Sequence, residues 1–222
     1  MTLNEYFKDW IKVIDKKILS DTLNTLSIEY KNNIVCPSQN DVFKVFQYCP
    51  YNELKIIILG QDPYPQKGIA TGIAFGNSAN STDISPSLQV LKESVINFEI
   101  SHNCTIFDPT LVEWCKQGVL LLNSALTCKL NEPGSHSILW RPFISTLLTN
   151  ICKYNTGIIY VLMGNQAKTF LPYINKKFNT VIETDHPAFC ARRGTNLCEV
   201  FKRVNTLLHQ KYGESIIWYK EN

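Results

Sequence analysis

Residues 54–65 read LKIIILGQDPYP, and this stretch decides the fold. Its apolar, β-branched run is short and stops at Gly60, which predicts a buried strand. Pro63 and Pro65 then stiffen a turn that holds an acid, an amide and a phenol just beyond the strand. Because ligands of open α/β sheets bind outside the carboxyl ends of the strands, Asp62 is a candidate catalytic group. The alternative is a strand-terminating turn that Asp62 caps.

Other short apolar runs are also followed by polar residues. These runs occupy residues 118–122, 157–163 and 180–183. The polar residues beyond them are Asn123, Asn165 and His186. The carboxyl ends of parallel strands share one edge of a sheet, so we expect these side chains and Asp62 to converge on one crevice.

Helical patterns alternate with the strands, which predicts an α/β fold. We expect one domain over residues 1–222, with a central four-stranded, mainly parallel sheet flanked by helices. Its first part, about residues 1–30, carries apolar side chains at helical spacing and predicts an N-terminal helical segment.

Capping signals place further helices. Ser85 and Pro86 predict the N-cap and first position of one helix, and Pro142 predicts the start of another. Asn196 with Glu199 resembles a capping box at the start of the last helix, which a glycine at 213 ends.

Composition limits the classes of function. The 222 residues suit one domain, and a hydrophobic content of 45% supports a core. The net charge of +3 permits a polyanionic partner only through a local basic patch. The sequence has neither a cationic, apolar leader nor an apolar run of membrane-spanning length. We therefore expect an intracellular protein of the cytoplasm or nucleus that is not secreted and has no membrane partner.

The eight cysteines never fall at C-x-x-C spacing, and most have apolar neighbours. We expect buried free thiols in a reducing compartment rather than disulfides or ligands of a metal or cluster. No cofactor is expected. The cysteines are Cys36, Cys49, Cys104, Cys115, Cys128, Cys152, Cys190 and Cys198.

Residues 61–64 read QDPY, residues 72–75 read GIAF and residues 117–123 read QGVLLLN. In this order the motifs resemble those of the family 1 uracil-DNA glycosylases. Residues 61–64 (QDPY) resemble the family's water-activating motif, and residues 72–75 (GIAF) resemble the segment with its base-stacking phenylalanine. Residues 117–123 (QGVLLLN) resemble its specificity strand. Further matches are SPSL at 85–88, SHS at 135–137, GN at 164–165 and HP at 186–187. The resemblance runs in order from about Val35 to Trp218, which is nearly the whole chain.

The resemblance implies a monofunctional hydrolase that flips deoxyuridine out of DNA, releases uracil and leaves an abasic site. The implied catalytic residues are Asp62 and His186. The implied substrate-binding residues are Gln61, Tyr64, Phe75 and Asn123. The implied DNA-binding residues are Ser87, Gly164, Asn165, Ala188, Phe189, Cys190 and Arg193.

The residue types suit these roles. The carboxamide of Asn123 can accept from uracil N3–H and donate to O4, whereas cytosine presents the reverse pattern. Phe75 can stack on the base, and Tyr64 can exclude the methyl group of thymine. Asp62 can stabilise a sugar cation and orient water, and a neutral His186 can donate to uracil O2.

The chain departs from the family pattern at several positions. Pro65 stands where most members have histidine, and Asn165 replaces the usual serine. Ala188 stands at a phosphate-contacting serine, and Cys190 stands at the leucine that fills the emptied base stack. Phe189 is a second candidate for that wedge.

Two other functions remain open on the sequence. One is a glycosylase fold used as a DNA-binding or polymerase processivity module, and the other is a mismatch glycosylase with a wider base range. The expected partners are uracil-containing DNA and either a DNA-mimic protein inhibitor or a replication partner, with the chain a monomer. Ser135-His136-Ser137 supports either the rim of the site or only a turn.

Overall fold

A computed structural model describes residues 2–32, 34–79, 84–96 and 105–221. At its centre is a four-stranded sheet in the order β4-β2-β6-β7, and each neighbouring pair of strands is parallel. This sheet confirms the predicted α/β architecture. Its strands are β2 (Ile56–Gly60), β4 (Val119–Asn123), β6 (Ile159–Met163) and β7 (Thr180–Thr184).

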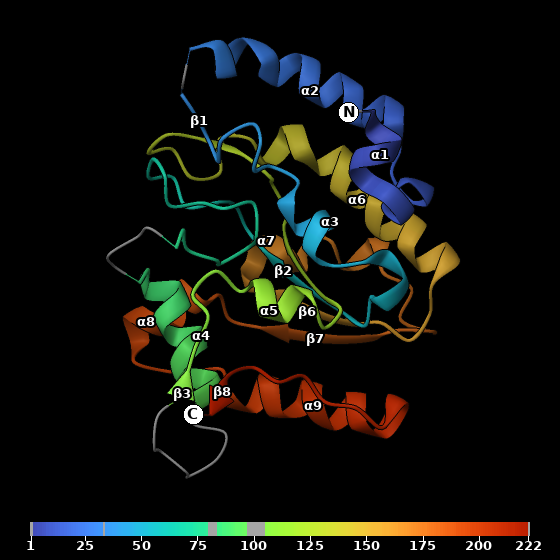
Figure 1. The fold of residues 1–222 in the computed structure, drawn as a ribbon, viewed down its shortest axis with the longest axis vertical. Coiled ribbons are helices and arrows are strands. Elements are labelled where there is room, and N and C mark those ends of the chain that lie inside the picture. The colour runs from blue at the N-terminus through green and yellow to red at the C-terminus, as the bar shows by residue number, and fades with distance from the viewer. Residues whose placement is uncertain (1, 33, 80–83, 97–104, 222) are drawn as a thin grey trace.

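Helices cover both faces of the sheet (Figure 1). One layer contains α6 (Ser137–Tyr154) with α2 (Lys16–Lys31) packed on it. The other contains α4 (Pro86–Ile96), against which α8 (Pro187–Arg193) and α9 (Cys198–Tyr212) pack. Strands β2, β4 and β6 are buried along their whole length between these layers, which is why they read as continuous apolar runs.

The N-terminal segment is helical, but it is not one helix. It contains α1 (Leu3–Phe7), a 3-10 turn η1 (Lys8–Lys12) and then α2. Asp15 starts α2 because its Oδ1 accepts from the backbone N–H groups at 17 and 18, both at 3.0 Å. The buried Trp10 instead donates from Nε1 to the carbonyl of Cys49 at 2.7 Å. The apolar spacing of residues 1–30 follows one helical period and therefore does not reveal the breaks between these three elements.

Helix α6 starts earlier than Pro142, at Ser137, and the proline lies inside it. The buried side chains of His136 and Trp140 anchor the first turn, in which the Trp140 N–H donates to the His136 carbonyl at 3.1 Å. Pro142 removes one donor for the carbonyl of Ile138. Ile138 is 89% exposed, so this loss falls at the surface rather than in the core.

Two further helix starts can be compared with the sequence. Helix α4 starts at Pro86 as predicted, and the Leu88 N–H donates to Ser85 Oγ at 3.3 Å. Helix α9 does not begin with the predicted capping box, because its N-cap is Leu197. Asn196 Oδ1 instead accepts from the N–H of Cys198 at 3.1 Å. The predicted end of α9 at a left-handed glycine, residue 213, is confirmed.

Smaller elements connect the layers. They are β1 (Val35–Cys36), α3 (Lys44–Tyr48), η2 (Tyr51–Glu53), β3 (Thr105–Ile106), α5 (Val112–Cys115), β5 (Cys128–Lys129), α7 (Gly164–Lys168), η3 (Leu171–Tyr173) and β8 (Lys220–Glu221).

Seven cysteines in the described part of the chain are free thiols, and Cys104 lies outside it. Within that same part, no helix is both long and apolar enough to cross a membrane.

Candidate active site

A small cavity lies at the carboxyl edge of the sheet, where convergence was predicted. Its volume of about 170 Å³ is below the roughly 300–1,000 Å³ of sites for drug-sized ligands, which suits one small ring. Every residue predicted to be catalytic or to bind substrate lines it, and so do Ser87 and Ala188. The lining residues are Gln61, Asp62, Pro63, Tyr64, Pro65, Ala70, Gly72, Ile73, Phe75, Ser87, Asn123, Pro133, His186 and Ala188.

The carboxylate of Asp62 is half-buried just beyond β2. Its Oδ2 accepts a hydrogen bond from the backbone N–H of Gly134. Burial raises the pKa of Asp62 above its usual value, and the Gly134 N–H acts in the opposite direction. Gly134 has φ +82°, a conformation that glycine adopts readily. The sequence reading missed Gly134, although Pro133-Gly134 is a turn signal.

Asn123 and Phe75 meet above Gly60. Asn123 is the last residue of β4, pairs in register with Gly60 and is 8% exposed. A Cβ on Gly60 would lie 2.8 Å from Asn123 Oδ1 and 2.8 Å from Phe75 Cζ. Gly60 therefore leaves room for these two side chains, which line the cavity, a role that the sequence reading did not assign. Phe75 is held with φ +67°, which is uncommon for a residue other than glycine.

The side chain of Tyr64 is fixed by hydrogen bonds at the cavity wall. Its hydroxyl donates to the carbonyl of Phe75 at 2.9 Å and accepts from Ser85 Oγ. Burial raises the pKa of Tyr64 to about 12, so the phenol is neutral. Ser85 thus both caps α4 and holds the tyrosine ring, which narrows the space available to a bulky base.

His186 enters the cavity as the N-cap of α8. Its Nδ1 accepts from the backbone N–H of Ala188 at 3.1 Å, so the neutral ring carries its proton on Nε2. Burial and the nearby Arg192 lower the pKa of His186, which favours this neutral form. The ring centroid lies 5.7 Å from that of Phe75. Gly164 permits this approach, because a Cβ there would lie 2.8 Å from His186 Cβ.

The segment after His186 is the helix α8 rather than an extended loop. Cys190 is 2% exposed and packs in the hydrophobic core, so it does not project as a wedge. Phe189 is partly exposed, and the guanidinium of Arg193 lies 4.8 Å from its ring centroid. Of the two candidates for the wedge, Phe189 is the one with an accessible side chain.

Of the other residues predicted to bind DNA, Ser87 lines the cavity and Gly164 packs against His186. Ser87 lies in the first turn of α4 and is 6% exposed, with its position on the cavity wall. Gly164 is buried, whereas Asn165 is exposed in the first turn of α7. Asn165 does not line the cavity, so the predicted convergence holds for Asp62, Asn123 and His186 but not for Asn165.

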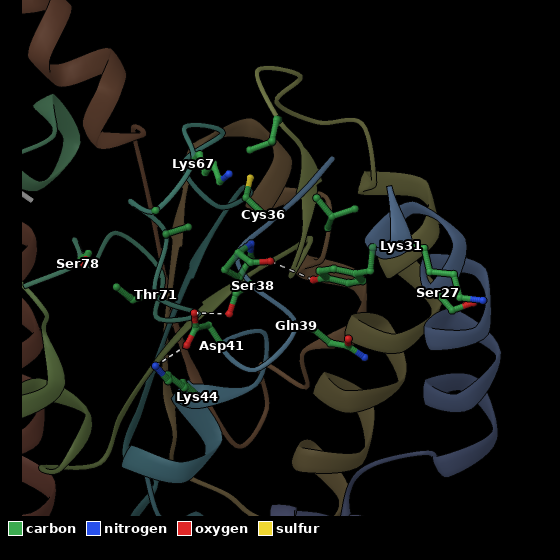
Figure 2. Close-up of a pocket in the computed structure, with 16 residues that line it drawn as sticks. Ser27, Lys31, Cys36, Ser38, Gln39, Asp41, Lys44, Lys67, Thr71 and Ser78 are labelled. Atoms are coloured by element: carbon green, nitrogen blue, oxygen red, sulfur yellow. Dashed lines mark hydrogen bonds and ion pairs between the residues drawn. The ribbon is translucent and has the colours of Figure 1, made fainter. Parts of the chain in front are cut away.

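A larger cavity of about 700 Å³ shares one lining residue, Ala70, with the small cavity. Figure 2 shows the residues that line the larger cavity. Its walls come from α2, β1 and the segments around residues 38–44 and 67–71. In Figure 2, Ser38 and Lys44 both point at Asp41, and Ser38 Oγ donates to Asp41 Oδ2 at 2.6 Å. This cavity contains no residue that the sequence predicted for chemistry or binding, so the small cavity is the candidate active site.

The fold and the small cavity define an α/β protein with one site for a small planar ring. The chain belongs to the uracil DNA glycosylase superfamily, whose family model matches residues 46–209. It is 32% identical to the uracil-DNA glycosylase of Fusobacterium nucleatum over 96% of each chain. It is 34% identical to that of Mesomycoplasma hyopneumoniae, with 91% of this chain and 92% of the relative covered.

Solved structures agree with this fold. The mimivirus uracil-DNA glycosylase has a TM-score of 0.76 at 20% identity, with 98% of this chain and 93% of that chain covered. A variant of mimivirus UNG in complex with UGI has a TM-score of 0.80 at 21% identity, covering 97% of this chain and 86% of that chain.

Proposed function

We propose that the chain hydrolyses the N-glycosidic bond of deoxyuridine in DNA, releasing uracil and leaving an abasic site. The observation that carries this proposal is the meeting of an acid, a carboxamide, an imidazole and an aromatic ring in one small cavity. A base inside a duplex cannot reach such a cavity, so the nucleotide is flipped out of the helix at a cost of a few kcal/mol. The whole described chain acts as one domain around this site.

Uracil is selected by its edge and by its size. Asn123 accepts from N3–H and donates to O4, and a buried mismatch with cytosine leaves polar groups unpaired. The Phe75 ring stacks on the base, and such stacking contributes about 1–3 kcal/mol to binding. Tyr64 stands where the methyl group of thymine would project, and its two hydrogen bonds prevent it from moving aside.

Cleavage separates charge. The C–N bond breaks with its electron pair going to uracil, and Asp62 faces the positive charge that develops on the sugar. The Nε2–H of His186 donates to uracil O2 as negative charge develops there, a type of contact that contributes on the order of 3 kcal/mol. A water oriented by Asp62 then adds to the anomeric carbon and gives its proton to the Asp62 carboxylate, and the released uracil anion takes up a proton from solvent. None of the described residues that line the cavity is a lysine, which supports hydrolysis without a Schiff base or strand cutting.

DNA contact is local and surrounds the cavity. Ser87 and the Gly164-Asn165 turn are suited to phosphates, and Arg193 adds positive charge. Phe189 is the wedge that fills the emptied base stack in a duplex. A protein inhibitor that mimics DNA would compete for this surface. One chain supplies every group, so the activity needs no second subunit, and DNA as substrate places it inside the cell.

The proposed function is tested with an oligonucleotide that contains one uracil, and with a matched one that contains thymine. Alkali cleaves the abasic product, so release of the base appears as strand breakage. We expect breakage of the uracil strand alone after treatment of both with the wild-type protein. Binding to both strands without any breakage would instead support the DNA-binding module.

A further inference from the structure

A short turn holds the amide that contacts the catalytic carboxylate. It runs from the end of β5 to the start of α6, and the Gly134 N–H on it donates to Asp62. The Lys129 N–H donates to Ser135 Oγ at 2.8 Å, which closes the turn on itself. The position of the Asp62 carboxylate therefore depends on how firmly this turn is held.

One side chain of α2 contacts both ends of that turn. Glu29 Oε1 lies 3.3 Å from Lys129 Nζ, and Glu29 Oε2 lies 2.8 Å from His136 Nε2. His136 is 4% exposed, and the side chain of Glu29 is 29% exposed. A carboxylate that is largely removed from solvent and contacts two cationic or donor groups is held more firmly than an exposed surface pair.

A chain of hydrogen bonds sets the direction of the His136 proton. Trp140 Nε1 donates to Thr127 Oγ1 at 2.7 Å, and Thr127 Oγ1 lies 2.8 Å from His136 Nδ1. A carboxylate oxygen only accepts, and Glu29 Oε2 lies 2.8 Å from His136 Nε2, so the neutral imidazole carries its proton on Nε2. Nδ1 is then the acceptor for the Thr127 hydroxyl proton. Burial lowers the pKa of His136 and favours this neutral ring.

We propose that Glu29 is a positioning residue for uracil hydrolysis. Through His136 and Lys129 it holds the turn so that the Gly134 amide stays on Asp62. The inference rests on the proposed role of Asp62. Since Asp62 acts on charge that develops in the transition state, a loosened turn lowers kcat and leaves substrate binding unchanged. Misplacement of a reacting group by about 1 Å costs about a hundredfold in rate.

The test uses Glu29→Ala and Glu29→Gln in the full chain, with Asp21→Asn as the control on the exposed face of the same helix. We expect kcat to fall about ten- to hundredfold in Glu29→Ala. Glu29→Gln keeps an oxygen for His136 and loses the charge opposite Lys129, so its kcat lies between that of the wild type and that of Glu29→Ala. The KM for a uracil oligonucleotide stays within about twofold, and Asp21→Asn behaves as wild type.

A double-mutant cycle separates this role from a general structural one. In single-turnover reactions with excess enzyme, Glu29→Ala adds little to the loss already caused by Asp62→Asn, because it acts through that carboxylate. Losses that multiply in the double variant, or a Glu29→Ala change confined to the unfolding temperature, would overturn the proposal. If Glu29→Ala does not fold, Glu29→Gln carries the same cycle. Full activity of Asp62→Asn would overturn the proposed function instead, whatever Glu29 does.

Discussion

Gly60 and Asn123 are paired across strands β2 and β4, and a Cβ at position 60 would lie 2.8 Å from the carboxamide oxygen of Asn123. A methyl group there would push aside the side chains of Asn123 and Phe75, both of which line the small cavity. We predict that Gly60→Ala lowers kcat/KM for uracil release by about a hundredfold while circular dichroism remains that of the folded protein. Wild-type activity of Gly60→Ala would show that this position has room for a methyl group.

The edge-reading role of Asn123 predicts a change of base. Asn123→Asp replaces the donor that serves uracil O4 with an acceptor for the amino group of cytosine. We therefore expect the variant to release measurable cytosine from DNA and to lose about tenfold or more of its activity on uracil. Release of each base is measured from matched oligonucleotides by alkaline cleavage. A variant that processes uracil normally and ignores cytosine contradicts this assignment.

Phe189 predicts a difference between duplex and single-stranded DNA. Only a duplex leaves a gap in its stack when the nucleotide flips, so Phe189→Ala slows uracil release from a duplex by about tenfold and changes single strands little. Phe178→Ala is the matched control, because that phenylalanine is also exposed beneath a cationic side chain, Lys177, and lies before β7 at the opposite end of the sheet. Equal slowing on both substrates argues against a wedge.

The shifted pKa values predict an acidic limb in the pH profile. The reaction needs an ionised Asp62 and a neutral His186, and both forms are lost as the pH falls. We expect kcat/KM to rise with pH and then to level off. Arg192 lowers the pKa of His186, so Arg192→Gln raises it and moves the histidine-dependent part of the limb to higher pH. The surface variant Arg203→Gln is the control and leaves the limb in place.

The raised pKa of Asp62 also affects the stability of the folded protein. Burial raises the folded-state pKa of Asp62, so the folded protein disfavours its ionised form relative to the unfolded chain. Stability linked to this group is present below its unfolded pKa and is lost as the pH rises through the folded pKa. Asp62→Asn, which stays neutral and keeps an oxygen for the Gly134 amide, is expected to unfold at a higher temperature than wild type at pH 7. The two unfolding temperatures should become more similar at acidic pH.

The sequence was sufficient for the sheet and for the meeting of Asp62, Asn123 and His186, but it wrongly added Asn165 to that group. Apolar runs that end at Gly60 and Asn123 mark buried parallel strands, and parallel strands share an edge, so convergence follows from the fold class. The geometry inside the cavity depends on tertiary contacts that no local pattern encodes. The left-handed backbone of Phe75 and the reach of Glu29 across to His136 are of this kind.

Helix boundaries failed where tertiary contacts override local preference. Pro142 signals a helix start, yet the buried His136 and Trp140 extend α6 by a further turn in front of it. The sequence also left both Phe189 and Cys190 as candidates for the wedge, because the helical register of α8 decides which one faces the core.

The central claim is that Asp62 drives cleavage of a flipped deoxyuridine. Its most direct test is the single-turnover rate of uracil release by wild type and by Asp62→Asn, on the same oligonucleotide and with excess protein. We predict that the rate falls by about a thousandfold or more while the affinity for the oligonucleotide changes little. A variant that releases uracil at the wild-type rate would contradict the account.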